Sequence, residues 1–211
     1  IELGAGNGEM MKVLVDTFNN FPQFKKSCKI NILEKSELLK KTQKDKIKNK
    51  KIKWLNNLNE LNNFPCIFIA NEFFDALPIK QFLKKDKKWY ERYVNFSNQK
   101  KLEYSDIPFD MQKFEKKIKF KISYKQKFIE YSPLATEYLK TITNKIKLCD
   151  GGILIIDYAY LDKEMKNTLQ AVSKHKYCNL LKNFRNSDIT YNLSINLINM
   201  IIKKLSKCSS Q

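Results

Sequence analysis

The chain has 211 residues, which is enough for one sizeable domain with a core of its own. No stretch of about 18 residues is apolar throughout, which excludes an ordinary membrane-spanning helix. The formal net charge is +18 at pH 7, yet only Arg92 and Arg185 among the 40 basic residues are arginine. Because nucleic-acid readers rely on the bidentate guanidinium of arginine, we expect a solvated lysine-rich surface and no nucleic-acid partner. The five cysteines form no C-x-x-C pair, which indicates a reducing compartment and argues against a metal site.

The first half of the chain alternates between strand and helix patterns. In the segment that follows the first glycines, Met10, Val13, Leu14 and Phe18 recur at helical spacing. The expected elements are strands at 1–3, 29–36, 51–58 and from 66, and helices at 9–20 and 36–46. The strand that begins at 66 is continuously apolar, as buried strands of parallel sheets are.

The second half of the chain adds a different pattern. Residues 80–131 alternate loosely, like an antiparallel hairpin, and keep enough apolar side chains to form an inserted β-rich segment. Further expected elements are helices at 133–148 and 194–207, a second buried strand at 151–160, and a short helix or loop at 167–176. Strands that alternate with helices predict an α/β domain with a parallel sheet, whose carboxyl edge binds ligands.

The opening segment "ELGAGNGE" contains three of the five glycines of the chain, Gly4, Gly6 and Gly8. A tight turn without a ligand accounts for the glycines alone. Glu2 and Glu9 flank them, and a pyrophosphate between two carboxylates costs about 1 kcal/mol or more. S-adenosylmethionine carries a sulfonium and an ammonium in place of phosphates. The acidic loop therefore favours this methyl donor, and an oxidoreductase with a nicotinamide cofactor is the weaker alternative.

Glu34 stands at the end of the second expected strand. Its separation from Gly8 along the sequence is near the roughly 20 residues expected between a glycine loop and this acid in a βαβ unit. An acid at this place can accept hydrogen bonds from ribose hydroxyls. On its own it is read equally well as an exposed residue at a strand end. Together with the glycine loop, ribose binding is the better interpretation.

Several segments of the chain resemble the MidA-like family. They are "ELGAGNG", "LEKSELLKKTQ", "ANEFFDALPIKQF", "WYERYV", "EYSPLA", "GGILIIDYAY", "NTLQAVSKHK" and "SDITYNLSIN", in that order. The resemblance covers residue 1 to about 200 and implies a class I S-adenosylmethionine-dependent methyltransferase. It further implies a Rossmann-like sheet with helices on both faces. The mitochondrial members of this family are protein arginine methyltransferases needed to assemble respiratory complex I, so a complex I subunit is the implied protein substrate.

The resemblance and the residue types together give three sets of candidate site residues. The cofactor would be bound by Glu2, Gly4, Ala5, Gly6, Asn7, Gly8, Glu34, Lys35, Ser36 and Asn71. The catalytic candidates are Glu72, Asp75, Asp157 and His175, and the substrate-binding candidates are Phe73, Tyr158, Asp188 and Thr190.

Arginine is protonated at neutral pH, so carboxylates must orient and polarise its guanidinium before methyl transfer. Glu72 and Asp75 are three residues apart, and a helical turn would place both on one face, where they either act on substrate or cap the turn. Asp157 either contacts substrate or caps a loop. His175 is either a general base or an exposed residue of a surface helix. For Phe73, core packing competes with substrate contact.

The chain also departs from the family pattern. Ala159 stands where family members usually have glycine, and Asn186 and Ser187 replace a glycine before "DIT". Family members carry a substantial region before the glycine loop, so we expect residues 1–211 to be one methyltransferase domain that lacks this region, with the insertion at about 80–131. These departures keep a second hypothesis open, a non-catalytic assembly chaperone with a vestigial pocket. A bacterial cytoplasm is the predicted location, with the mitochondrial matrix as the alternative.

Overall fold

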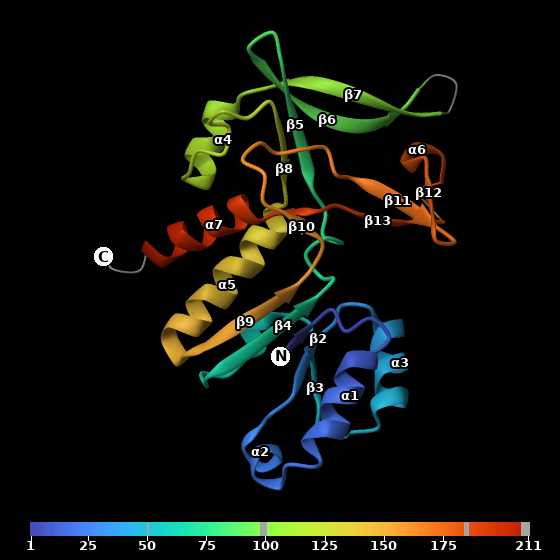
Figure 1. Cartoon of the computed structure of the whole chain (residues 1–211), viewed down its shortest axis with the longest axis vertical. Coiled ribbons are helices and arrows are strands. Elements are labelled where there is room, and N and C mark those ends of the chain that lie inside the picture. Colours follow the sequence, from blue (N-terminus) through green and yellow to red (C-terminus); the bar gives the residue numbers. More distant parts are fainter. Residues whose placement is uncertain (50, 98–100, 184–185, 208–211) are drawn as a thin grey trace. The chain divides into compact units, whose positions relative to one another are not determined.

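The computed structural model describes residues 1–49, 51–97, 101–183 and 186–207 (Figure 1). By its internal contacts the chain divides into two compact units. Unit 1 comprises residues 1–73 and 141–157, and unit 2 comprises residues 74–140 and 158–211. The prediction of one domain with an insertion stays a prediction.

Unit 1 contains a five-stranded parallel sheet in the order β3-β2-β1-β4-β9. Its strands are β1 (Glu2–Leu3), β2 (Asn31–Leu33), β3 (Lys53–Leu55), β4 (Cys66–Asn71) and β9 (Gly151–Ile156). The order reverses between β1 and β4, where parallel α/β sheets open a crevice at their carboxyl edge. The predicted α/β class with a parallel sheet is confirmed, because the apolar runs formed strands and the intervening periodic segments formed helices.

The helices of unit 1 follow the predicted segments, with two short additions. They are α1 (Glu9–Phe18), α2 (Pro22–Ser27), α3 (Glu37–Ile47), the 3₁₀ turn η1 (Leu58–Glu60) and the part of α5 (Pro133–Cys149) from residue 141 onward. The buried face of α1 is formed by Met11 and Val15, whereas Val13 is 63% exposed. Of the predicted face, Leu14 is partly buried against the core cluster. The expected helix is therefore present, but its core-facing stripe is shifted from the predicted one.

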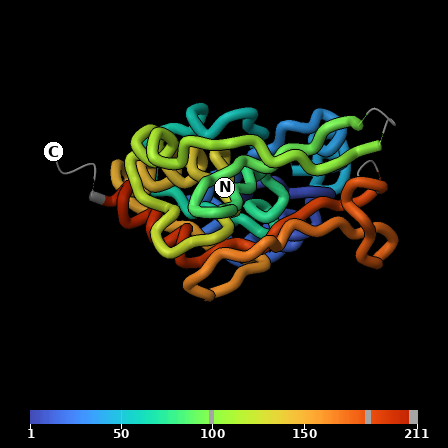
Figure 2. Tube along the Cα trace, turned by 90° about the horizontal axis from the view of Figure 1, so that it is seen from above, coloured from blue at the N-terminus to red at the C-terminus, as the bar shows by residue number. Residues whose placement is uncertain are grey.

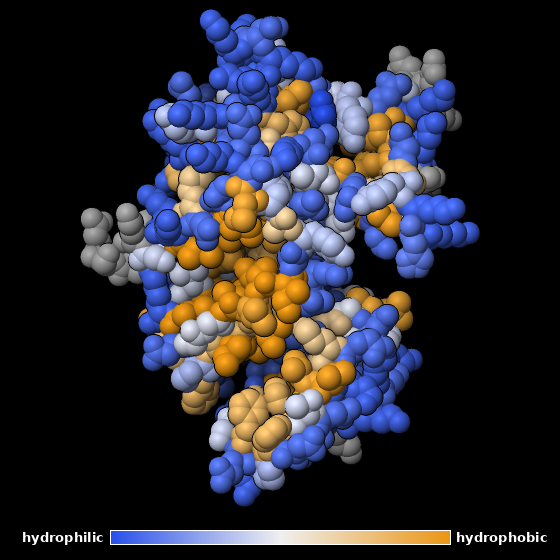
Figure 3. All heavy atoms as spheres, in the orientation of Figure 1, coloured by the Kyte–Doolittle hydropathy of each residue, from blue (hydrophilic) through white to orange (hydrophobic). Residues whose placement is uncertain are grey.

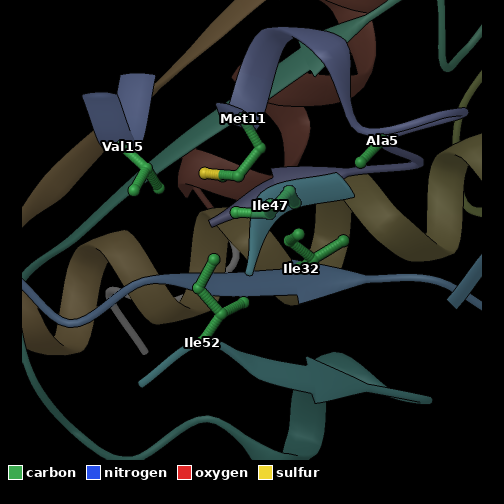
Figure 4. Packing of buried hydrophobic residues seen from close by; sticks show 6 residues of the cluster. All are labelled: Ala5, Met11, Val15, Ile32, Ile47 and Ile52. Carbon is green, nitrogen blue, oxygen red and sulfur yellow. The ribbon is translucent and has the colours of Figure 1, made fainter. Parts of the chain in front are cut away.

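One apolar cluster joins the glycine loop to α1, α3 and the sheet in unit 1 (Figure 4). Its buried members are Ala5, Met11, Val15, Ile32, Ile47 and Ile52. Met11 and Val15 are four residues apart and therefore lie on the same side of α1. This packing fixes the loop that leaves β1, because Ala5 is anchored in the cluster while Gly6 and Asn7 are exposed.

The last strand of the parallel sheet differs from its prediction. β9 lies at the edge of the sheet and pairs only with β4 among the described strands. Leu154 is 54% exposed and Ile156 is 47% exposed, and Figure 3 shows hydrophobic atoms in this region. A second buried strand at 151–160 was therefore the wrong expectation. The segment also ends earlier, because Ala159–Tyr160 form a separate strand, β10.

Unit 2 contains a four-stranded antiparallel sheet in the order β7-β6-β5-β8. Its strands are β5 (Lys80–Lys85), β6 (Lys88–Phe96), β7 (Leu102–Phe109) and β8 (Phe128–Tyr131), and α4 (Met111–Ile118) follows β7. Figure 2 shows the traces of β6 and β7 side by side. Phe82 stacks against Phe109 and Phe114, with ring centroids 4.6 and 5.2 Å away. The antiparallel hairpin predicted within 80–131 is confirmed.

The remainder of unit 2 is built from short strands and two helices. They are β10 with β14 (Leu193–Ser194), then β11 (Gln170–Ser173), β12 (Lys176–Cys178), β13 (Asp188–Thr190), α6 (Leu180–Asn183) and α7 (Ile195–Lys207). The expected helix at 194–207 is confirmed. A short helix at 167–176 is wrong, and the alternative of a loop holds only for residues 167–169, because β11 and β12 form a hairpin from residue 170 onward. No helix in the described ranges is long and apolar enough to cross a bilayer.

Candidate cofactor site

The glycine loop leaves β1 at the point where the strand order reverses. Gly4 and Gly6 have φ of +63° and +51°, in the left-handed region that other residues rarely adopt. A Cβ on Gly4 would lie 2.7 Å from Cδ2 of Phe73, so the aromatic ring packs directly on the loop. A Cβ on Gly6 would meet nothing within 4 Å. The exposed side of the loop at Gly6 therefore offers open space for a ligand to approach the backbone.

Glu34 follows β2, the strand next to β1 in the sheet. The residue is 8% exposed, and its carboxylate is fixed by the chain that follows it. Glu34 Oε1 accepts hydrogen bonds from the backbone N–H groups of Lys35 and Ser36, each at 2.9 Å. Ser36 in turn caps α3, because its Oγ accepts a hydrogen bond from Leu39 N at 3.3 Å. Glu34, the acid predicted to bind ribose, is thus a rigidly held hydrogen-bond acceptor at the carboxyl edge of the parallel sheet.

Two further residues of unit 1 join the loop and the acid, and sequence reasoning missed both. Gln43 of α3 donates to the carbonyl oxygen of Gly6 and to Glu34 Oε2, and Trp54 of β3 donates to Gln43. The position of Gln43 in the sequence could have indicated its role. Gln43 stands four residues before Ile47, on the buried face of an otherwise lysine-rich helix. A polar residue at such a position indicates a buried hydrogen-bonded role.

Glu2 of β1 is the second buried carboxylate of this region, with 3% of its surface exposed. Its Oε2 has no hydrogen-bond partner within the described part of the chain. Burial raises the pKa of Glu2 from 4.5 to about 7. A buried acceptor without a donor favours a ligand that brings a cationic or hydrogen-bonding group.

We expect Glu2→Gln to stabilise the protein increasingly as pH rises. The folded state holds the Glu2 proton to a higher pH than the unfolded state, so the wild-type protein loses stability between its unfolded pKa of 4.5 and its folded pKa of about 7. The full difference corresponds to about 3 kcal/mol near pH 8. Denaturant unfolding from pH 5 to 8 measures it, with Glu9→Gln as control. Parallel stability curves for wild type and Glu2→Gln would contradict this expectation.

Glu9 contributes less to the electrostatics of the loop than the sequence suggested. Its side chain is 75% exposed and forms an ion pair with Lys46 of α3. The neighbouring lysine offsets its charge, so the argument against a pyrophosphate rests on the buried Glu2. No group of three His, Cys, Asp or Glu side chains in the described ranges could hold a metal ion.

The end of β4 carries Asn71 and the acceptor candidates that follow it. Glu72 has φ of +46°, and residues 72–77 form bends and turns. The expected helical turn that would place Glu72 and Asp75 on one face is therefore wrong, and so is helix capping. Instead, Glu72 N donates to Ile156 O at 2.8 Å, because β4 and β9 pair up to that register. This places the backbone of Glu72 beside the chain that continues into Asp157.

The other acceptor candidates belong to unit 2, where the segment 188–194 connects most of them. Tyr191 N donates to Asp75 O at 3.1 Å, and Leu193 N donates to Tyr158 O at 2.8 Å. Thr190 Oγ1 accepts a hydrogen bond from Gln170 at 3.3 Å. The structure thus brings Asp75, Tyr158 and Thr190 to one backbone segment, which begins with the exposed Asp188.

His175 lies at the tip of the β11–β12 hairpin, whose first strand pairs with β13. Lys174 and His175 have φ of +50° and +60°, as both central residues of a tight type I′ hairpin turn do. The His175 side chain is exposed. The expectation of a surface helix here is therefore wrong, and the alternative of a general base stays a prediction.

The strand order with its reversal between β1 and β4, and the glycine loop at that point, define a Rossmann-like α/β fold. A sequence model of the family described as "Putative S-adenosyl-L-methionine-dependent methyltransferase" matches residues 1–211. The chain belongs to this family. The predicted family and its methyl-donor cofactor are confirmed at this level.

Curated relatives are similar to the chain at lower identity. The mitochondrial protein arginine methyltransferase NDUFAF7 homolog of Caenorhabditis elegans is 25% identical over 230 aligned positions, covering 96% of this chain and 52% of that protein. The human mitochondrial protein arginine methyltransferase NDUFAF7 is 24% identical and is covered over 48% of its length. The chain therefore spans about half the length of these relatives.

Solved structures share the fold. A Burkholderia thailandensis protein whose crystal structure contains S-adenosyl-homocysteine superposes with a TM-score of 0.75 at 18% identity, over 97% of this chain and 55% of that one. A native crystal structure from the same organism gives a TM-score of 0.76 at 18% identity. At 18% identity, this structural similarity shows that the chain shares their fold.

Proposed function

We propose that the protein containing this chain transfers the methyl group of S-adenosylmethionine to an arginine of a protein substrate, in the assembly of respiratory complex I. The observation that carries the proposal is an open glycine loop with two buried carboxylates, Glu2 on β1 and Glu34 directly after the adjacent parallel strand β2. The names of the relatives support arginine as the acceptor. Those names also place the relatives in mitochondria, and the matrix is the corresponding proposal for this chain.

The residues of the loop region fit the methyl donor chemically. The cofactor carries cationic groups and a ribose, and it supplies a methyl group bound to a sulfonium. Glu2 provides a buried acceptor without a partner, which suits a cationic or donating group. Glu34 provides a fixed carboxylate for hydroxyl groups, and Gly6 leaves the backbone accessible. A pyrophosphate would instead bring only further acceptors to the buried carboxylate of Glu2, which would repel it.

For the acceptor we assign the orienting role to Glu72 and Asp157. Both follow strands that end at the carboxyl edge of the sheet, and the Glu72 N–H bonds to the residue before Asp157. A guanidinium is always protonated in water, so the carboxylates would have to orient it and accept the proton that its nitrogen loses on methylation. Asp75, Tyr158, Asp188 and the other unit 2 candidates remain proposals for contacts with the protein substrate.

Titration of the full-length protein with S-adenosylmethionine tests the cofactor part of the proposal. Gly6→Asn should weaken binding at least about tenfold, because its side chain enters the open space beside the loop. Asparagine tolerates the left-handed backbone, so the unfolding transition should stay near that of wild type. Absence of heat with wild-type protein, or equal affinity after Gly6→Asn, would contradict the proposed cofactor site.

Incubation with a radiolabelled methyl donor and complex I subunits tests the acceptor part. We expect label on arginine, and expect Glu72→Gln to abolish the transfer while cofactor binding is retained. Label on lysine would overturn the acceptor assignment. Subunit binding without any transfer would favour an assembly chaperone instead.

A further inference from the structure

Gln43 is fully buried, with 0% of its surface exposed, yet every polar atom of its side chain has a partner. Its Nε2 donates to Gly6 O at 2.8 Å and to Glu34 Oε2 at 3.1 Å. Its Oε1 accepts a hydrogen bond from Trp54 Nε1 at 2.8 Å. One amide therefore connects the glycine loop, the strand-end acid and β3 within unit 1.

Trp54 decides which way this amide points. The indole N–H only donates, so the amide oxygen of Gln43 must face Trp54. The amide nitrogen must then face the other two groups, and both of them are oxygen acceptors. The two amide hydrogens have one acceptor each. The orientation of Gln43 is thus fixed by its partners, and a flipped amide would face like groups on every side.

The same amide determines which part of Glu34 is available. A carboxylate has about four lone-pair positions. Two donors, the N–H groups of Lys35 and Ser36, occupy Oε1, and Gln43 occupies one position on Oε2. The remaining acceptor position lies on Oε2. A hydroxyl group that donates a hydrogen bond to Glu34 therefore donates it to Oε2, the oxygen that Gln43 holds in position.

We propose that Gln43 is a positioning residue for ribose recognition, with its amide oriented by Trp54. It holds Glu34 Oε2 and the Gly6 backbone at a fixed separation, so that one of the cofactor's ribose hydroxyls meets a preorganised acceptor. This inference rests on the proposed cofactor. A leucine or methionine would fill the same volume between α3 and the loop without burying an amide, so packing alone does not account for a glutamine here.

Calorimetric titration of the full-length protein with S-adenosyl-homocysteine and its 2′-deoxy and 3′-deoxy analogues tests the proposal. Gln43→Leu should weaken binding of the parent ligand about tenfold. It should weaken binding much less for the deoxy analogue whose missing hydroxyl contacts Glu34, because that contact is already lost. Glu34→Gln combined with Gln43→Leu should cost less than the sum of the single changes. Gln23→Leu, at an exposed helical site, is the matched control.

The outcomes separate two kinds of failure. If wild-type protein binds none of the ligands, the proposed cofactor fails, and the positioning role fails with it. If wild-type protein binds but Gln43→Leu weakens all three ligands equally, the role is structural and only the present inference is overturned. Should Gln43→Leu not fold, Trp54→Phe decides the question. It keeps an aromatic ring at this position but removes the donor, and we expect a smaller, hydroxyl-dependent loss of about threefold.

Discussion

Replacing Gly151 by alanine is expected to lower the free energy of unfolding by about 4 kcal/mol. Gly151 pairs with Cys66 where β9 and β4 begin, and its φ is +129°. A Cβ at this position would lie 1.9 Å from Cys66 O and 2.7 Å from Cys66 C. These neighbours are backbone atoms of a central strand, so the clash is relieved only by displacing the sheet. The backbone conformation adds strain of its own.

Gly152→Ala is the matched control for this change. It is the next residue of the same strand, and a Cβ there would meet nothing within 4 Å. We expect its stability to stay within about 0.5 kcal/mol of wild type. Denaturant unfolding of the three proteins, followed by circular dichroism, measures both differences. Similar stabilities for the two alanine variants would show that the start of β9 is not held as described.

Gly151 also illustrates why much of the fold could be predicted. In a chain with only five glycines, the two glycine-containing segments mark the loop after β1 and the start of β9, where Gly151 has a backbone conformation that favours glycine. Apolar runs that alternate with helical spacing then predict the parallel sheet. The edge position of β9 could not be predicted in this way, because an apolar run reads the same in a central and in an exposed edge strand.

The sequence predicts those candidate site residues whose type and position at a strand end indicate a role. It does not predict residues that come together only through the tertiary fold. Glu34 and the glycines are marked by their own positions at strand ends. Gln43 and Trp54 act through each other, and only the pairing of β2 with β3 and the packing of α3 bring them together. The hairpin at 170–178 was missed because its turn residues, Lys174 and His175, are not the usual Asn-Gly of such turns.

The second large effect on stability is expected at Glu130 of unit 2. This residue lies on β8 with 5% of its surface exposed, and its carboxylate accepts hydrogen bonds from three residues. Glu130 Oε1 accepts hydrogen bonds from Gln81 Nε2 at 2.8 Å, Thr168 N at 3.1 Å and Leu169 N at 3.2 Å. Glu130 Oε2 accepts one from the Thr168 hydroxyl, which in turn accepts one from Asn192 N at 2.9 Å.

Glu130→Ala should therefore lower the free energy of unfolding by about 4 kcal/mol, because it leaves several buried donors unpaired and opens a cavity. Thr168→Val keeps the volume and removes only the hydroxyl bridge, so we expect a loss of about 1 to 2 kcal/mol. Glu103→Ala, at an exposed position of β7, should change stability by no more than about 0.5 kcal/mol.

The same network connects β8 to the backbone of residues 168–169 and, through the Thr168 hydroxyl, to Asn192 within the segment 188–194 that also carries Thr190. Loss of Glu130 should therefore loosen that segment beyond the general loss of stability. Amide hydrogen exchange measures this directly, as faster exchange of Thr168, Leu169 and Asn192 than of strands β5 and β6. If exchange rises uniformly across unit 2 instead, Glu130 stabilises the unit as a whole and does not specifically anchor the segment.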